Sequence, residues 1–276
     1  MLDLLKEMFS YPFMIRAFLV GTIVALCSSL LGVSLVLKRY SMIGDGLSHV
    51  GFGALALATA LNMAPLTVAI PIVVLAAFLL LRISENSSIK GDAAIALIST
   101  GALAMGVMVI SVTTGMNTDV CNYLFGSILS MSQNDVNLSV VLSIIILALF
   151  ILFYNRIFAV TFDESFAKAT GTNAGLYDML IALLTALIIV LGMRMMGALL
   201  ITSLIVFPAL TSMRLCKRFR TVIINSAVIS VMCLWTGLTI SYIYATPTGA
   251  SIVLCNIIVF FLYWIIQTTK GVVGHA

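Results

Sequence analysis

The stretch "RYSMIGDGLSHVGFGALALATAL", residues 39–61, decides the class of fold, because Leu, Ala, Val and Phe fill most of its second half. This apolar run approaches the ~20 residues that an α-helix needs to cross the hydrocarbon core of a bilayer. Near its start, however, Asp45 and His49 lie four positions apart. An Asp inside a membrane span costs roughly 2.5–3.5 kcal/mol on insertion scales, so the pair must face a cavity, a partner or the interface.

The composition of the whole chain also indicates a membrane protein. Of its 276 residues, 62% are hydrophobic and only 9% are charged, and the mean hydropathy is +1.21. Soluble domains are about 45–50% apolar and about 25% charged, so most of this surface must meet lipid. The net charge of +4 includes no run that would follow a nucleic-acid backbone, and we expect no nucleic-acid partner.

Apolar runs of membrane-spanning length recur along the chain. We therefore predict an all-α membrane protein, a polytopic bundle of about eight or nine transmembrane helices with one short cytoplasmic helix. We expect residues 1–276 to form a single transmembrane domain. The mixed segment 117–134, "NTDVCNYLFGSILSMSQN", predicts a short or re-entrant helix packed on the bundle. The nine candidate spans are 17–37, 43–62, 65–81, 93–113, 136–155, 177–193, 197–213, 221–243 and 250–268.

The basic residues predict the orientation of this bundle. Cytoplasmic loops of membrane proteins carry an excess of Lys and Arg. Here 11 of the 14 basic residues fall in loops on one side of the nine spans, so we place that side in the cytoplasm. The loops lie near 38–42, 82–92, 156–176 and 214–220 and at the C-terminus, and the residues are Lys38, Arg39, Arg82, Lys90, Arg156, Lys168, Arg214, Lys217, Arg218, Arg220 and Lys270.

The longest of these loops, "NRIFAVTFDESFAKATGTNAGLYD" at 155–178, predicts a short amphipathic helix. Phe162, Phe166 and Ala169 recur at i, i+4 and i+7, and Gly171 is a suitable end for the helix. A helix with one apolar face outside the membrane either docks on a partner or lies in the headgroup layer, and the periodicity leaves both open. The polar residues off this stripe are Asp163, Glu164 and Lys168.

The pair Asp45 and His49 has two interpretations from its spacing alone. At i and i+4 the two side chains share a helix face, with Cβ atoms about 5–6 Å apart. A carboxylate and a neutral imidazole are good ligands for Zn²⁺, Mn²⁺ or Fe²⁺. Alternatively, Asp45 is an N-terminal acid favoured by the helix dipole with Ser41 as the cap, and His49 is a satisfied histidine bonded to Asp45.

The sequence also predicts how Arg194, Pro208 and several small residues pack within the bundle. Arg194, near an outer helix end, is expected to extend its charged head to the interface. Pro208 is expected to kink or break its helix unless neighbours satisfy the freed backbone groups. Glycine and alanine pairs four apart favour close helix contact, and glycines beside Asp45 would admit a neighbouring backbone or a solute. These small residues are Ala54 with Ala58, Ala102 with Gly106, and Gly44, Gly46, Gly51 and Gly53.

Several catalytic and nucleotide-binding motifs are missing from the sequence. It contains no GxxxxGK[ST], so the chain has no P-loop of its own, and any work against a gradient must draw energy from elsewhere. Neither GxSxG nor HExxH occurs. We expect a protein that is not an enzyme.

The patterns "GDGLSH" at 44–49 and "FDESFAKATG" at 162–171 belong to a set of stretches that occur in collinear order over most of the chain. Together these stretches resemble the membrane permeases of ATP-binding-cassette (ABC) importers for divalent metal ions, the zinc, manganese and iron group. The full set is "LKRYSMIGDGLSHVGFGALALA" (37–58), "CNYLFGSILSMSQND" (121–135), "FDESFAKATGT" (162–172), "MGALLITSLIVFPALTSMRL" (196–215) and "SYIYATPTGASIVL" (241–254).

This resemblance implies a function and a set of partners. The protein would be a multi-pass permease of the bacterial cytoplasmic membrane, and a homodimer or a pair with a close relative, with the pathway between the two subunits. An ABC ATPase would dock on the cytoplasmic side and consume the ATP, and an extracytoplasmic metal-binding protein would deliver the divalent metal as substrate. This chain itself would bind no cofactor.

The resemblance also implies roles for particular residues. Asp45 and His49 match the acid and histidine that would contact the ion transiently in the pathway. The stretch 162–171 would be the coupling helix that meets the ATPase. A different reading of the same residues is a secondary transporter or channel without an ATPase, with Asp45 and His49 as an ion or proton relay. The residues implied in ATPase coupling are Phe162, Asp163, Glu164, Phe166, Ala167 and Gly171.

Overall fold

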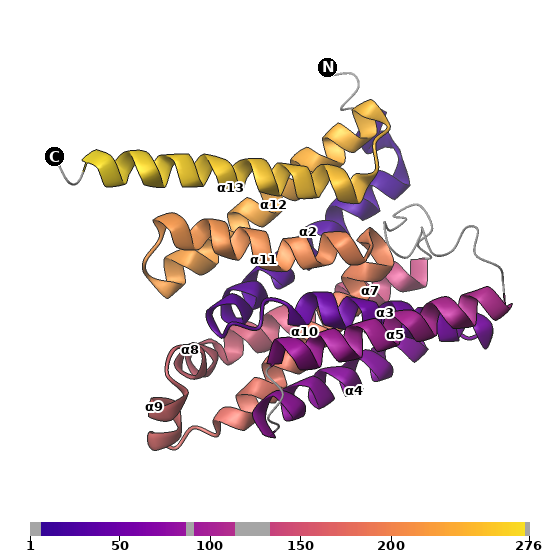
Figure 1. The fold of residues 1–276 in the computed structure, drawn as a ribbon. Helices are drawn as coiled ribbons and strands as arrows, with labels where there is room; N and C mark the ends of the chain where they lie inside the picture. Colours follow the sequence, from indigo (N-terminus) through magenta and orange to yellow (C-terminus); the bar gives the residue numbers. More distant parts are fainter. Residues whose placement is uncertain (1–6, 87–90, 114–132, 274–276) are drawn as a thin grey trace.

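A computed structural model describes residues 7–86, 91–113 and 133–273, and within these ranges the chain forms helices and short links without any strand (Figure 1). The predicted all-α class is confirmed. The elements are α2 (Pro12–Leu37), α3 (Ile43–Ala60), α4 (Pro65–Asn86), α5 (Gly91–Thr113), α7 (Gln133–Leu152), α8 (Tyr154–Phe162), α9 (Glu164–Ala169), α10 (Ala174–Met196), α11 (Ala198–Leu215), α12 (Phe219–Tyr244) and α13 (Thr248–Val273).

Each of the nine predicted spans coincides with one long helix. In the described ranges, seven helices are long and apolar enough to cross a membrane, namely α2, α4, α5, α7, α10, α12 and α13. The two others are α3, which carries Asp45 and His49 in its 18 residues, and α11, whose apolar run Leu200–Leu215 is shorter. The predicted polytopic bundle is therefore confirmed. All but the last two residues of the mixed segment 117–134 lie outside the described residues.

Ordinary capping chemistry sets several helix boundaries. Pro12 and Pro65 open α2 and α4, where the missing N–H of proline costs no helical hydrogen bond. The side-chain oxygen of Asn173 accepts the backbone N–H of Leu176 at 3.3 Å and caps α10. Pro208 lies inside α11, which continues to Leu215, so this proline does not break the helix.

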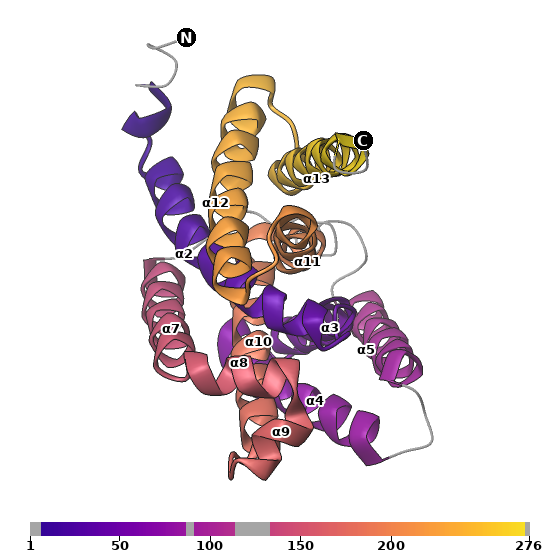
Figure 2. The ribbon, with the colours of Figure 1, turned by 90° about the vertical axis from the view of Figure 1, so that its left-hand side faces the viewer.

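The links between helices gather at two opposite ends of the bundle. One end holds the link from α2 to α3, the end of α4, the α8–α9 pair, the link from α11 to α12 and the end of α13; it lies at the left of Figure 1 and faces the viewer in Figure 2. The loops that the basic residues assigned to the cytoplasm therefore lie together. We call this the cytoplasmic end, and the opposite one the outer end.

Helices α2 and α10 form the centre of the bundle, and most of their apolar lengths are buried. Helix α10 contacts α2, α3, α4, α7, α8, α9 and α11. Helices α5, α7 and α13 lie at the periphery, and most of their apolar surface remains exposed. In a membrane this surface meets lipid hydrocarbon or another chain.

Helices α3 and α5 pack with their backbones in contact. A Cβ atom added to Gly53 would lie 2.7 Å from the carbonyl oxygen of Ala102, and one added to Gly106 would lie 2.9 Å from the Cα atom of Gly53. Both distances are shorter than real Cβ contacts, so a larger residue would force the helices apart. The close packing predicted at Ala102 and Gly106 is thus confirmed, and the partner is the helix that carries Asp45 and His49.

Side-chain hydrogen bonds join α2 to α12, one in the interior and one at the surface. The hydroxyl of Ser230 donates to the carbonyl oxygen of Ala25 at 3.0 Å. Farther along, the indole N–H of Trp235 donates to the hydroxyl of Thr22 at 2.9 Å. Interhelical hydrogen bonds in membrane bundles contribute about 0.6 kcal/mol on average and up to about 1.7 kcal/mol.

We expect Ser230→Ala to destabilise the purified protein by about 0.6–1.7 kcal/mol, because it removes a bond between α2 and α12. The measurement is the thermal unfolding midpoint in detergent. Thr236→Ala is the matched control, since exposed Thr236 lies on the same helix and its hydroxyl bonds within α12, to Met232 at 2.8 Å and Cys233 at 3.2 Å. Equal shifts in both variants would show that the bond to α2 contributes nothing.

Candidate functional site

A tight corner between α2 and α3 places Asp45 close to the end of α2. The N–H of Tyr40 bonds the carbonyl of Leu35 at 2.8 Å. The N–H of Arg39 bonds the carbonyl of Val36 at 3.1 Å, and Arg39 adopts a left-handed conformation with φ +62°. This is the Schellman motif, in which glycine is the usual left-handed residue. The motif fixes the direction in which the chain enters α3.

The first turn of α3 differs in one respect from the expected cap. Met42 is the N-cap residue and no side-chain hydrogen bond caps the helix, so the predicted role of Ser41 as cap is wrong. Asp45 lies in the first turn, where the helix dipole favours a carboxylate, as the structural interpretation expected. The hydroxyl of Ser48 donates to the backbone carbonyl of Asp45 at 2.7 Å.

The side chains of Asp45 and His49 share one face of α3, as predicted. Oδ2 of Asp45 lies 3.7 Å from Nε2 of His49, within ion-pair distance but beyond a hydrogen bond. Nδ1 of His49 is buried and has no hydrogen-bond partner in the described part of the chain. The expected hydrogen bond between the two residues is therefore wrong, and the side chain of Asp45 stays 46% exposed.

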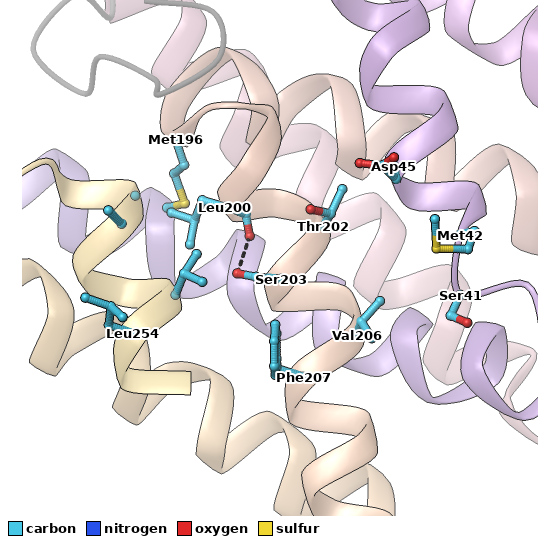
Figure 3. Close-up of a pocket in the computed structure, with 13 residues that line it drawn as sticks. Ser41, Met42, Asp45, Met196, Leu200, Thr202, Ser203, Val206, Phe207 and Leu254 are labelled. Atoms are coloured by element: carbon cyan, nitrogen blue, oxygen red, sulfur yellow. Dashed lines mark hydrogen bonds between the residues drawn. The ribbon is translucent and has the colours of Figure 1, made fainter. Parts of the chain in front are cut away.

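Asp45 lines an open groove of about 670 Å³ between α3, α11 and the first half of α13. Figure 3 shows its carboxylate pointing toward α11, on which Thr202 and Ser203 lie. The groove is lined by residues from the link between α2 and α3, at the cytoplasmic end, to the end of α10, at the outer end, so it runs along the bundle. Among the described residues that line it, Asp45 is the single charged one. We call it the α3–α11 groove.

One copy of the described chain offers few metal ligands. Nowhere in residues 7–86, 91–113 and 133–273 do three His, Cys, Asp or Glu side chains come close enough to hold a metal ion. Asp45 and His49 supply one carboxylate and one imidazole from one helix face. A tetrahedral zinc site takes four ligands, so a full coordination shell needs donors beyond this pair.

The glycines of α3 serve contacts with neighbouring helices. A Cβ atom added to Gly46 would lie 2.6 Å from Cγ2 of Ile95 in α5. One added to Gly51 would lie 2.6 Å from Cε of Met193 in α10. These glycines do not line the α3–α11 groove. Of the two expectations for them, close approach of a neighbouring helix is the one that the structure supports.

The predicted short helix is present as α9, but it does not include Phe162, and the segment 162–171 also contains the junction with α8. Helix α8 ends at Phe162 and α9 begins at Glu164, with Asp163 between them in an extended conformation (φ −148°, ψ 92°). The side chain of Asp163 accepts the backbone N–H of Phe166 at 2.9 Å and caps α9. Asp is among the most favourable N-cap residues, and its extended backbone ends α8 where α9 starts.

The predicted helix end at Gly171 is confirmed. Gly171 has φ +81°, which glycine adopts without strain. Its N–H bonds the carbonyl of Lys168 at 3.0 Å, and the N–H of Thr172 bonds the carbonyl of Ala167 at 2.9 Å. This second Schellman motif returns the chain to the start of α10.

The predicted apolar stripe of this segment remains largely exposed at the cytoplasmic end. The side chains of Phe162 and Phe166 are 56% and 62% exposed, and Ala169 is also exposed. The contact with the bundle is made by Ala167, which is fully buried against α8 and the start of α10. Two aromatic rings at the cytoplasmic end are thus available to a partner.

No pattern along the chain predicts the ion pair between Lys38 and Asp178 at the cytoplasmic end. The ammonium of Lys38, just after α2, pairs with the carboxylate of Asp178 near the start of α10, and the two side chains are only 10% and 8% exposed. Beside them lies a cavity of about 630 Å³, which Glu164 and Lys168 of α9 also line. We call it the polar cavity. The partners are 140 positions apart, so spacing along the sequence could not join them.

A second ion pair joins α10 to α7 near the outer end. A guanidinium nitrogen of Arg194 lies 3.9 Å from Oδ2 of Asp135, and both side chains are about four fifths buried. The sequence predicted that the guanidinium of Arg194 would extend to the membrane interface. In the structure it instead pairs with an acidic residue within the bundle. The acidic residue lies in the first turn of α7, a position favoured by the helix dipole.

Comparison with known proteins places this fold. The model of the ABC 3 transport family matches residues 10–267. The chain is 27% identical over 266 residues to the manganese transport system membrane protein MntC of Halalkalibacterium halodurans, covering 96% of this chain and 91% of that protein. It is 28% identical over 252 residues to the high-affinity zinc uptake system membrane protein ZnuB of Haemophilus influenzae, covering 91% and 97% respectively.

A solved structure shares the fold. The structure of PsaBC from Streptococcus pneumoniae in complex with Fab contains a chain that matches with a TM-score of 0.85 and 29% identity, covering 95% of this chain and 94% of that one. The long apolar helices and their bundle define a multi-pass membrane protein, and a groove along the bundle holds one charged side chain. Since the family model matches nearly the whole chain, the protein belongs to the ABC 3 transport family.

Membership of this family has direct consequences. The chain is the permease of an ABC transport system and is a multi-pass protein of the bacterial plasma membrane. A permease of this kind works with a separate ATPase, so the reading as a transporter without an ATPase is not favoured. The family is one of transport proteins.

Proposed function

We propose that this chain is the permease of an importer that moves divalent metal ions (zinc, manganese or iron) into the cytoplasm, and that Asp45 and His49 contact the ion on its way. One observation carries the site assignment: Asp45 is a half-exposed carboxylate on the wall of a membrane groove whose other described lining residues are uncharged. A charge placed there is costly unless it meets a counter-ion. The names of the relatives MntC and ZnuB support the choice of metal as substrate.

The pathway lies between two copies of the chain. One copy supplies a carboxylate and an imidazole, and a two-fold axis would bring the same two groups from a second copy, which completes four ligands. The α3–α11 groove is open along the bundle and so is suited to form half of such a pathway. The site must release the ion as well as accept it, so it holds the metal transiently.

The α8–α9 junction receives the ATPase at the cytoplasmic end. Phe162 and Phe166 supply exposed aromatic rings, the residue type that anchors protein interfaces. Asp163 caps α9, Ala167 packs α9 against α8 and α10, and Gly171 ends the segment. Glu164 bonds Lys168 at 2.7 Å on the exposed side. Closure of the ATPases around ATP then shifts the bundle between inward-open and outward-open states.

Import of a metal ion requires further partners and ligands besides the ATPase. An extracytoplasmic binding protein delivers the metal to the outer end, and the metal is the substrate of the permease. The permease binds no cofactor of its own, and ATP is consumed in the ATPase. This agrees with the missing P-loop in the sequence.

Cross-linking tests whether Asp45 faces its own copy across the pathway. We expect Asp45→Cys to form cross-linked dimers in membranes with a short thiol-specific reagent, because residues that share one ion lie within a few ångströms. Val112→Cys is the matched control, since Val112 is 82% exposed on α5 and lies outside the groove. The readout is the dimer band on a denaturing gel. Cross-linking of Asp45→Cys no stronger than that of Val112→Cys would refute the shared pathway.

A further inference from the structure

We propose that Lys38 is a positioning residue that couples the ATPase-docking α8–α9 junction to the helix that carries Asp45. The assignment rests on the proposed function, because it links the two surfaces to which that function gives roles. Lys38 contacts Asp178 of α10, shares the polar cavity with Glu164 of α9, and lies on the corner that leads into α3.

The first step is the buried ion pair between Lys38 and Asp178. Both side chains are about nine tenths buried. Removing two charges from water is costly, and replacing a buried pair with apolar residues of similar size is often neutral or stabilising. Stability alone therefore does not account for this pair. Its geometry fixes the end of α2 against the start of α10, the helix that follows α9.

The second step is the electrostatic interaction between Lys38 and α9 across the polar cavity. Glu164 and Lys168 line the cavity together with Lys38 and Asp178. The hydrogen bond from Lys168 lowers the pKa of the Glu164 carboxyl, and the positive charge of Lys38 contributes to the same shift. The ammonium of Lys38 thus lies within the electrostatic reach of two acids, one on α10 and one on α9.

The third step is that the polar cavity leaves room for Lys38 to change partner. Its volume is about 630 Å³. Thr161, on α8, lines it with a buried hydroxyl that has no hydrogen-bond partner in the described part of the chain. An ammonium that moves from Asp178 toward Glu164 would therefore pass polar groups. A shift of α9 toward the bundle would draw Lys38 with it.

The fourth step is the short, stiff connection from Lys38 to the metal contact. Asp45 lies seven positions after Lys38. Between them, Arg39 and Tyr40 close the Schellman motif with backbone bonds of 3.1 and 2.8 Å. A corner held in this way transmits a displacement instead of absorbing it. Movement of Lys38 therefore changes the position of the first turn of α3 and of the carboxylate on it.

The test measures the ratio of metal transported to ATP hydrolysed by the complete complex in proteoliposomes, with zinc or manganese, whichever the wild type transports. The double variant Lys38→Met/Asp178→Leu removes both charges with little change in size. We expect it to assemble with the ATPase and to hydrolyse ATP within two-fold of wild type, with the ratio about ten-fold lower. A wild-type ratio would show that the pair only supports the fold, and would overturn the proposal.

Two further variants separate coupling from structure. Lys38→Asp/Asp178→Lys restores an ion pair between α2 and α10 but sets an acid against Glu164, and we expect its ratio to stay low. Glu164→Gln removes the charge of a half-exposed side chain with little change in size, and we expect about a three-fold lower ratio. A wild-type ratio in either variant contradicts the proposal, even where the Lys38→Met/Asp178→Leu protein fails to assemble.

The outcome can be separated from a failure of the proposed metal site. If Asp45→Asn transports metal normally, the metal contact is wrong whatever the Lys38 variants do. If Asp45→Asn abolishes transport while all the Lys38 and Glu164 variants keep the wild-type ratio, the metal contact stands and the coupling role of Lys38 is refuted. The Lys38→Arg variant is expected to keep most of the wild-type ratio of metal transported to ATP hydrolysed, because it keeps the positive charge at this corner.

Discussion

Asp45→Asn is expected to lower metal uptake by at least ten-fold without changing the amount of permease in the membrane. Asn has nearly the same shape as Asp but lacks the negative charge that attracts a divalent cation. Interactions with charged groups are worth about 1.5–3 kcal/mol, which corresponds to about 10- to 150-fold. The side chain of Asp45 is 46% exposed and lies beyond hydrogen-bond distance of His49, so we expect the substitution to have little effect on the fold.

Uptake of labelled zinc, manganese and iron by cells that lack another importer measures this effect. His49→Ala should give a loss of similar size, and Asp45→Glu should keep part of the activity because it retains the carboxylate. Thr100→Val serves as a control, since Thr100 is exposed on α5 and its hydroxyl bonds within that helix. Wild-type uptake by Asp45→Asn in a normally assembled complex would exclude a ligand role.

Phe166→Ala is expected to weaken binding of the ATPase by about 30-fold or more. An aromatic anchor at the centre of an interface commonly contributes ~2 kcal/mol or more. The side chain of Phe166 is 62% exposed in the free permease, so its removal opens no cavity in the bundle. The effect should therefore appear in binding and leave the thermal stability of the permease unchanged.

Co-purification and titration of the ATPase onto the detergent-solubilised permease measure the affinity. Phe261→Ala is the matched control, because Phe261 is 54% exposed on α13, a helix that lies away from the α8–α9 junction. Phe162→Ala should give a smaller loss, since this ring also packs on Phe158 and Phe219, at centroid distances of 5.0 and 5.7 Å. Unchanged affinity in Phe166→Ala would place the docking surface elsewhere.

The helices, and the side of the bundle on which their loops lie, could be predicted because each depends on a long stretch of neighbouring residues. An apolar run of about 20 residues has few structural outcomes, and each predicted span became one helix. The basic loops could be grouped for a similar reason, since the charges accumulate between spans. The helical face shared by Asp45 and His49 also followed directly from a spacing of four.

Other features depend on contacts that periodicity does not report. The apolar positions Phe162 and Phe166 continue in helical phase across Asp163, so their spacing hid the break between α8 and α9. The N-cap preference of Asp was the available signal for that break. Lys38 follows α2 and Asp178 lies near the start of α10, and only the fold brings them together. The glycines of α3 could equally have faced a pathway or a neighbouring helix.

The small size of α9 has a consequence for its dynamics. With six residues it is far shorter than the ~12–15 that an isolated helix needs to persist in water. It is held by the Asp163 cap, the turn at Gly171 and the buried methyl group of Ala167. Its amide hydrogens should therefore exchange with solvent through local opening, long before those of α10 do so. Slower exchange at α9 would then report, within the native permease, that a partner has covered the junction.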